Sequence, residues 1–159
     1  MIKKNVLDLG CGNGNQSMMW SSLNFNVDAV DIRKQKIKNV NFIQKDIRDF
    51  KIKKNKYSII IINFVFHYLE KEEALKILSE IKKNIKKNGY LFFKGLGIKD
   101  ESFKNRIMMS KGIFETKDIE EIFKDNKIIE LYNYSFEDQP HEGYNKFHEH
   151  KIVKAVIKF

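Results

Sequence analysis

Cysteine, proline and tryptophan are almost absent from this sequence of 159 residues, which contains one of each. The single cysteine, Cys11, has no partner for an intrachain disulfide, and this usage is typical of reducing compartments such as the cytoplasm. The one proline is Pro140, and no glycine-rich or serine-rich stretch divides the chain. Because flexible linkers have such compositions, we expect a single domain over residues 1–159.

Long apolar runs are missing as well. The longest, Ile59–Phe66, contains Asn63 and is far shorter than the ~20 residues that a membrane-spanning helix needs. Asp8 interrupts the first apolar segment, where a signal peptide would need unbroken apolar residues. We therefore expect a cytoplasmic protein that does not cross a membrane.

Acidic residues are outnumbered by basic ones, and the formal net charge is +9. A positive protein can bind RNA by releasing counterions from phosphates. The lysines are scattered, however, arginine is scarce, and the lysines of the range 82–87 fit the solvated side of one helix. The sequence favours a solvated surface, although a nucleic-acid partner is left open.

Short apolar segments alternate with helical patterns along the chain. The predicted strands are Asn5–Leu9, Asn26–Ile32, Val40–Gln44, Tyr57–Phe64, Gly89–Lys94, Lys127–Phe136 and Lys151–Phe159. The predicted helices run from Asn15 to Leu23, from Lys71 to Lys87, and onward from Thr116 as N-cap. This alternation predicts an α/β fold with a Rossmann-like, mainly parallel sheet and helices on both faces. Only residues 137–150 separate the last two strands, so we expect these to pair antiparallel.

The segment Val6–Asn15, VLDLGCGNGN, places Gly10, Gly12 and Gly14 directly after the first strand. Glycines have no side chain, so a glycine-rich turn at the start of a helix lets a ligand approach the backbone closely. Such a turn at the carboxyl edge of a parallel sheet suits a nucleotide-like ligand. The dinucleotide fingerprint G-x-G-x-x-G would require a glycine at position 15, which is Asn. A nicotinamide-dependent oxidoreductase is therefore disfavoured.

VLDLGCGNG resembles motif I of the class I S-adenosylmethionine-dependent methyltransferases. VDAVD, FIQKDIRDF, IINFVFHYL and KKNGYLFFKG resemble later motifs of that family, in order and over nearly the whole chain. The resemblance implies a seven-stranded sheet with an antiparallel last strand and S-adenosylmethionine as cofactor. It also implies that Asp31 binds the ribose, Asp46 the adenine amino group, and Asp8 and Asn63 the methionine end. The expected cofactor-binding residues are Asp8, Gly10, Cys11, Gly12, Asn13, Asp31, Ile32, Asp46, Ile47, Asn63 and Phe64.

Two departures from the family pattern concern the closure of the site. About seven residues separate Asp31 from the third strand, so the usual helix is expected to shrink to one turn around Lys34–Lys38. The family's N-terminal helical segment is not found before the first strand. We expect the site to be exposed to solvent, or to be closed by a partner subunit or by a lid over Leu96–Phe114. A homodimer is one possible form of such a partnership. This segment could equally form a helix that caps the core. Its apolar residues are Phe103, Met108, Met109 and Phe114.

The segment Asp138–Val153, DQPHEGYNKFHEHKIV, contains three of the four histidines. It is similar to a segment of small methyltransferases of the tellurite-resistance group. His148 and His150 share a face of a strand, and we expect one of them to act as a general base near the acceptor. Surface histidines are one alternative. A metal site, ranked last, is the other, with His141, His148 and His150 as ligands and Glu142 or Glu149 as a fourth.

His67 and Tyr68 follow the fourth strand and are further candidates for the acceptor side of the site, although His67 could instead be a capping residue. With His148 and His150 they complete the expected catalytic set. The predicted function is methyl transfer from S-adenosylmethionine to a small molecule. RNA or protein methylation and a non-catalytic S-adenosylmethionine-binding subunit remain alternatives. Amino-methylation of DNA is disfavoured because NFVFHY stands in place of a [DNS]-P-P-[YFW] motif.

Overall fold

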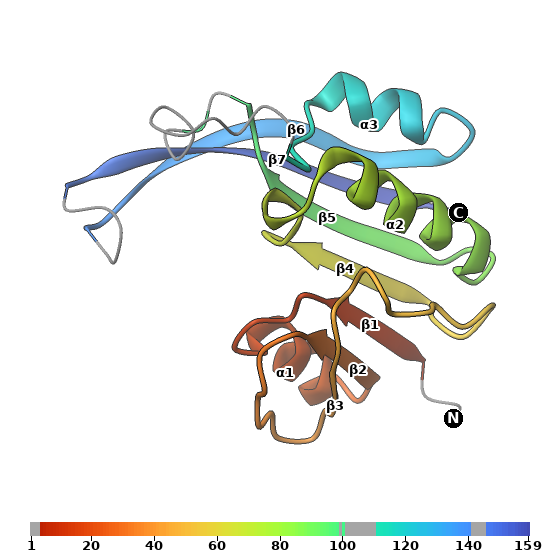
Figure 1. Cartoon of the computed structure of the whole chain (residues 1–159). Helices are drawn as coiled ribbons and strands as arrows, with labels where there is room; N and C mark the ends of the chain where they lie inside the picture. Colours follow the sequence, from red (N-terminus) through yellow and green to blue (C-terminus); the bar gives the residue numbers. More distant parts are fainter. Residues whose placement is uncertain (1–3, 99, 101–110, 141–145) are drawn as a thin grey trace.

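The protein forms a seven-stranded sheet in the order β3-β2-β1-β4-β5-β7-β6, as seen in a computed structural model (Figure 1). The model describes residues 4–98, 100, 111–140 and 146–159. The strands are β1 (Asn5–Leu9), β2 (Asn26–Asp31), β3 (Asn41–Gln44), β4 (Ile59–Asn63), β5 (Tyr90–Leu96), β6 (Lys127–Asp138) and β7 (His148–Lys158). The helices are α1 (Asn15–Ser22), the 3-10 helix η1 (Phe66–Tyr68), α2 (Lys71–Asn84) and α3 (Thr116–Ile122).

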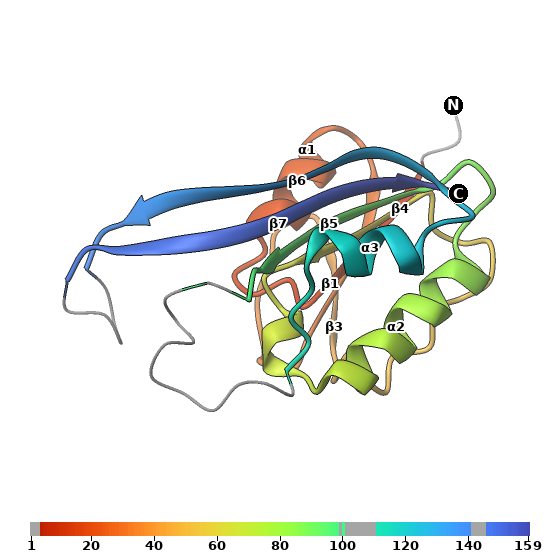
Figure 2. The same ribbon diagram turned by 90° about the horizontal axis from the view of Figure 1, so that it is seen from above.

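The pairing of the strands confirms the predicted mixed sheet. Strands β1 to β5 pair in parallel, whereas β7 pairs antiparallel with both β5 and β6. Both strands of the β6–β7 hairpin extend further toward their connection than predicted, and Asp138 pairs directly with His148. The hairpin therefore projects beyond the other strands of the sheet (Figures 1 and 2).

Alternating apolar side chains fill a core on each face of the sheet. In β4, Ile60 and Ile62 pack into the larger core, beneath α2 and α3, whereas Ile59 and Ile61 pack into a smaller core with Trp20 of α1. Figure 2 shows α1 on one face and α2 and α3 on the other. The prediction of helices on both faces is therefore confirmed, and the first four residues of β4 are all isoleucine because both of its faces are covered.

Three helix boundaries differ from the prediction. Helix α1 ends at Ser22, one residue before Leu23, which is its C-cap. Helix α2 ends at Asn84, before Lys87, because the buried Ile85 adopts an extended backbone conformation with ψ of 150°. Helix α3 has Glu115 as its N-cap, and Thr116 is its first residue. Glu115 and Asp118 satisfy each other's backbone N–H groups in a capping box, which an acid at each of these positions can form.

The helical turn predicted around Lys34–Lys38 is absent. Residues 32–40 contain bends and one turn, in which Asn39 has a left-handed φ of 58°. The nine residues between β2 and β3 are used to cross from the end of one strand to the start of its parallel neighbour. Too few remain to complete a turn of helix on the way.

In the part of the chain that the structure describes, none of the helices combines the length and the apolar character needed to cross a membrane.

Candidate active site

The topology of the sheet creates a crevice between β1 and β4. After β1 the chain continues to β2 and β3 on one side, and it then crosses to β4 and β5 on the other side. In open α/β sheets such a change of direction marks the ligand site, at the carboxyl ends of the strands. A pocket of about 570 Å³ lies there. It is lined by Gly10, Cys11, Gly12, Asp31, Ile32, Arg33, Asp46, Ile47, Arg48, Asn63, Phe64, Val65, Tyr68 and Leu69.

The glycine-rich turn after β1 forms one wall of this pocket. Gly10 has a φ of 71°, and a Cβ atom there would lie 2.3 Å from Cγ2 of Val65. Gly12 also has a positive φ, but a Cβ atom there would meet nothing closer than Nη2 of Arg33, at 4.0 Å. Gly10 is therefore required by close packing across the crevice, whereas Gly12 leaves room for a ligand beside the backbone.

Asp31 is held in place at the end of β2 by two backbone amides. Its Oδ2 accepts a hydrogen bond from the N–H of Gly12 at 2.9 Å, and its Oδ1 accepts one from the N–H of Arg33 at 2.9 Å. Each carboxylate oxygen can accept more than one hydrogen bond. Asp31 is thus oriented by the glycine turn and can still accept hydrogen bonds from ribose hydroxyls.

Asp46 follows β3 and binds the side chain of Arg48. Nε of Arg48 lies 2.9 Å from Oδ1 of Asp46, and Nη2 lies 2.5 Å from Oδ2. These hydrogen bonds from Arg48 lower the pKa of Asp46. The carboxylate therefore stays ionised at neutral pH and can accept a further hydrogen bond from an adenine amino group, beside the buried Ile47.

Arg33 and Arg48 line the pocket, although they were not among the predicted site residues. Each ends a tripeptide Asp-Ile-Arg, at residues 31–33 and 46–48, and in each the backbone N–H of the arginine donates to its aspartate at 2.9 Å. The repeated tripeptide is the sequence signal that could have identified them. Val65 and Leu69 also line the pocket, and the sequence contains no comparable signal for them.

Asn63 and Phe64 occupy the end of β4. Among the described residues, the buried Oδ1 of Asn63 has no hydrogen-bond partner, and a buried acceptor of this kind calls for a donor. Phe64 has a φ of 52°, a conformation that costs energy for a residue with a side chain and that is common at ligand sites. The ammonium group of S-adenosylmethionine is a donor of the required kind, so these residues fit the cofactor.

Two of the predicted cofactor residues, Asp8 and Asn13, do not line the pocket, whereas Cys11 does. Asp8 is 2% exposed, does not line the pocket, and accepts a hydrogen bond from Oγ of Ser17 in α1 at 2.6 Å. Burial raises the pKa of Asp8 to about 6. Cys11 lines the pocket, and burial raises the pKa of its thiol to about 12, which makes it unreactive as a nucleophile. Asn13 is exposed and outside the pocket lining.

The acceptor-side candidates divide between the pocket and a neighbouring cluster. Tyr68 is 75% exposed and lines the pocket. The ring of His67 contacts that of Tyr68, with centroids 4.1 Å apart. Burial lowers the pKa of His67 to about 4, and the charges of Asp100 and His150 act on it more weakly and in opposite directions. His67 is therefore neutral near pH 7.

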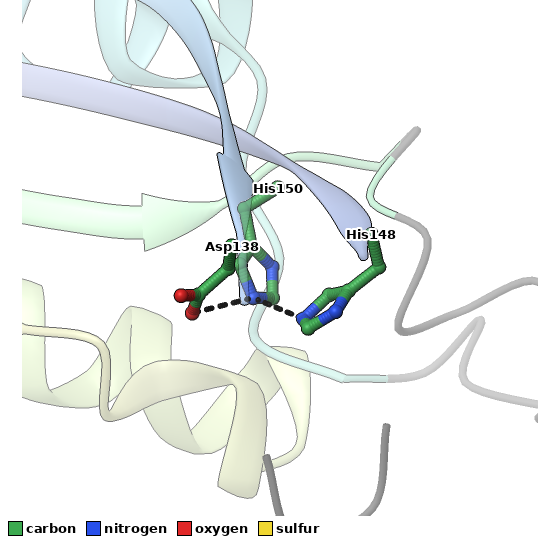
Figure 3. A group of neighbouring side chains, drawn as sticks. All are labelled: Asp138, His148 and His150. Carbon is green, nitrogen blue, oxygen red and sulfur yellow. Dashed lines mark hydrogen bonds and ion pairs between the residues drawn. The ribbon is translucent and has the colours of Figure 1, made fainter. Parts of the chain in front are cut away.

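His148 and His150 are close together, with 3.1 Å between their Nε2 atoms. Figure 3 shows both rings turned toward each other beside Asp138, whose Oδ2 lies 3.8 Å from Nε2 of His150. The buried carboxylate of Asp100 lies 3.0 Å from Nδ1 of His150. Neither aspartate was predicted from the sequence. Asp138 could have been found from the strand pairing that places it opposite His148, whereas no local pattern marks Asp100.

Among the described residues, neither Glu149 nor Phe114 belongs to this cluster. His141 and Glu142 lie outside the described residues. Glu149, the other candidate fourth ligand, is not part of the cluster, and its carboxylate lies 2.6 Å from Nζ of Lys151. Of the lid candidates, Phe103, Met108 and Met109 also lie outside the described residues. Phe114 is a core residue that packs on Phe66 and Phe93 and so cannot act as a lid.

A sheet of this order, with a glycine turn after β1, an acid after β2 and a crevice at the β1–β4 switch point, defines a class I S-adenosylmethionine-dependent methyltransferase. The family model described as "Methyltransferase domain" matches residues 6–89. The chain belongs to this family, whose cofactor is S-adenosylmethionine. No curated protein matches the chain by sequence.

Solved structures of methyltransferases share the fold. TehB from Haemophilus influenzae superposes with a TM-score of 0.78 at 20% identity, over 99% of this chain and 58% of that chain. A SAM-dependent methyltransferase from Archaeoglobus fulgidus has a TM-score of 0.72 at 15% identity, over 99% of this chain and 86% of that chain.

A third structure contains ligands. The 1,6-didemethyltoxoflavin-N1-methyltransferase from Burkholderia thailandensis, with bound 1,6-didemethyltoxoflavin and S-adenosylhomocysteine, has a TM-score of 0.69 at 13% identity. The superposition covers 98% of this chain and 71% of that chain. At these identities the likeness shows the fold alone, and this chain spans 58% of the length of TehB.

Proposed function

We propose that this chain transfers the sulfonium methyl group of S-adenosylmethionine to a small-molecule acceptor. The observation that carries the proposal is the convergence of four strand ends on one pocket, where Gly12, Asp31, Asp46 and Asn63 present complementary groups to the parts of the cofactor. A pocket of about 570 Å³ is within the usual range for a bound ligand of this size.

The reaction is an in-line displacement. A lone pair on the acceptor forms the new bond to the methyl carbon, and the electron pair of the breaking carbon–sulfur bond stays on sulfur. Because this step needs alignment and exclusion of water more than proton transfer, the contribution of the protein is to position the two reactants. Tyr68, exposed at the rim of the pocket, and its neighbour His67 are proposed to contact the acceptor.

A small acceptor is supported by the distribution of charge and by the comparisons. Several lysines are paired locally, such as Lys56 with Asp28, Lys71 with Asp118 and Lys154 with Glu130, and this pairing reduces the attraction to a polyanion. The methyltransferase from Burkholderia thailandensis was solved with a small molecule bound. RNA and protein are the acceptors against which the proposal is tested.

The test is the formation of S-adenosylhomocysteine over multiple turnovers with a panel of acceptors. The panel contains alkyl thiols, heteroaromatic amines, phenols and oxyanions, with bulk RNA and a mixture of unfolded proteins for comparison. We expect turnover with at least one small molecule and none with the macromolecules. Turnover confined to RNA or protein would contradict the proposal. Cofactor binding without turnover on any acceptor would favour a non-catalytic subunit.

The sequence left three interpretations open for His148 and His150: a proton acceptor, surface histidines and metal ligands. The arrangement of their ring nitrogens favours metal ligation.

A further inference from the structure

Asp138, His148 and His150 share one face at the open end of the β6–β7 hairpin. Asp138 is the last residue of β6 and pairs directly with His148, the first residue of β7. Directly paired residues and residues two apart on a strand point to the same side of a sheet. The strand register therefore brings the three side chains together, as Figure 3 shows.

Both imidazole rings are oriented through their Nδ1 atoms. Nδ1 of His150 lies 3.0 Å from Oδ2 of Asp100, and Nδ1 of His148 lies 3.2 Å from the backbone carbonyl oxygen of Lys146. An ionised carboxylate and a carbonyl oxygen accept hydrogen bonds, so both contacts suit the tautomer that carries its proton on Nδ1. In a neutral ring this leaves a lone pair on Nε2.

The two Nε2 atoms and a carboxylate oxygen lie close together. The Nε2 atoms lie 3.1 Å apart, and Oδ2 of Asp138 lies 3.8 Å from Nε2 of His150. One ligand atom from each of the three residues falls within 4.8 Å of the others. Zinc takes imidazole nitrogen and carboxylate oxygen at about 2.0–2.2 Å, which separates tetrahedral ligands by about 3.4 Å.

We propose that Asp138, His148 and His150 bind a divalent transition-metal ion, with zinc as the preferred occupant. Imidazole nitrogens and a carboxylate are the ligand set that zinc uses in many proteins.

The groups behind the ligands support the same assignment. Metal-binding histidines usually donate their second ring N–H to a carboxylate or a backbone carbonyl, which sets the tautomer and the ring orientation. Asp100 plays this part for His150, and the carbonyl of Lys146 plays it for His148. Asp100 is 1% exposed and also accepts a hydrogen bond from the backbone N–H of Lys151 at 2.7 Å. The carboxylate is therefore fixed in the position that orients His150.

The metal site would lie beside the cofactor pocket. Asp138 ends β6, which runs parallel to β5, so it is at the carboxyl edge of the sheet where the pocket also lies. Three protein ligands leave a fourth position for water or for another donor, as in catalytic zinc sites. If the proposed methyl transfer holds, an acceptor with a lone pair, such as a thiol or an oxyanion, would take that position. This last step rests on the proposed function, whereas metal binding itself does not.

Metal binding is tested on the full chain without a histidine tag. The metal content of the purified protein is measured by mass spectrometry, and the protein stripped by a chelator is titrated with Zn²⁺ against a chromophoric chelator. We expect one equivalent of zinc. The variants His148→Ala and His150→Ala should each weaken binding by about 100-fold or more, and Asp100→Asn by about 10–100-fold, since that residue orients a ligand.

Glu149→Gln is the matched control, because Glu149 stands between the two histidines and lies outside the cluster. Its zinc affinity should stay within about twofold of the wild type. Circular dichroism and thermal unfolding of the metal-free variants show whether each one folds. The inference is overturned if the wild type binds no zinc at micromolar concentration, which would leave a proton shared between the rings. It is also overturned if a folded His148→Ala/His150→Ala double variant keeps the affinity, or if Glu149→Gln loses it.

S-adenosylmethionine binding is measured on the same preparations. Cofactor binding that persists where zinc binding fails removes the metal site and leaves the proposed function standing. Zinc binding without cofactor binding does the reverse.

Discussion

The cofactor pocket and the histidine cluster lie at the same edge of the sheet but are assembled in different ways. The acids and the amide of the pocket, Asp31, Asp46 and Asn63, come within two positions of the ends of their strands, and backbone amides orient Asp31. The cluster combines Asp100, Asp138 and the pair His148 and His150, which come from three separate segments. The pocket therefore depends mainly on local backbone geometry, whereas the cluster depends on the register of the β6–β7 hairpin.

The largest effect is expected at Gly10, where local geometry is most demanding. Gly10→Ala would bring a Cβ atom 2.3 Å from Cγ2 of Val65 at a φ of 71°. The left-handed conformation and the overpacking together should lower the free energy of unfolding by roughly 2–4 kcal/mol. Gly12→Ala is the matched control, with a positive φ and no atom closer than 4.0 Å, and should cost about 1 kcal/mol. Urea unfolding measures both, and equal losses would show that the contact with Val65 does not matter.

The next effect concerns the buried Asp8 behind the turn. Burial raises its pKa from 3.8 to about 6, so the folded chain holds this proton more tightly than the unfolded chain. This tighter proton binding stabilises the folded chain fully below about pH 4, and the stabilisation is lost as the pH rises through about 6. Asp8→Asn should therefore gain up to about 3 kcal/mol in unfolding free energy relative to the wild type between about pH 4 and 7.5.

Urea unfolding at a series of pH values tests this prediction. Asp49→Asn, at an exposed acid, is the control and should track the wild type at every pH. A difference between Asp8→Asn and the wild type that does not change with pH would show that Asp8 is ionised alike in the folded and unfolded chains.

A smaller effect is expected from Asp31, which acts on the ligand rather than on the fold. Loss of hydrogen bonds to a charged group costs about 1.5–3 kcal/mol, so Asp31→Ala should weaken S-adenosylmethionine binding by roughly 10–100-fold. Asp49→Ala, at an exposed acid outside the pocket, should leave the affinity unchanged. Calorimetric titration with S-adenosylmethionine, and with NAD for comparison, measures both variants. An unchanged affinity in Asp31→Ala would place the ribose elsewhere.

The smallest effect tests whether the two regions are independent. Neither His148 nor His150 lines the cofactor pocket. The double variant His148→Ala/His150→Ala should therefore bind S-adenosylmethionine within about twofold of the wild type, since additivity holds for sites that share no partner. A larger loss in calorimetric titration would mean that the cluster and the pocket are energetically coupled.

The sequence predictions were more accurate for the cofactor pocket than for the histidine cluster. The positions of the strands, the antiparallel hairpin and most of the pocket residues could be predicted, because apolar periodicity and strand-end motifs are local properties. Asp8 and Asn13 were placed in the site by their position in the motif, but the structure puts Asp8 under the turn and Asn13 on the surface. Arg33 and Arg48 were missed although their tripeptides repeat, because an arginine after a strand usually reads as a surface residue.

The sequence by itself determined the α/β class, the positions of the strands and the glycine turn that shapes the cofactor pocket, because these follow from periodicity and backbone freedom within a few residues. Only the tertiary structure decided that Asp100 and Asp138 join His148 and His150, and that Phe114 belongs to the core. The physical reason is that these contacts depend on the register of distant strands, which is set by packing across the whole sheet.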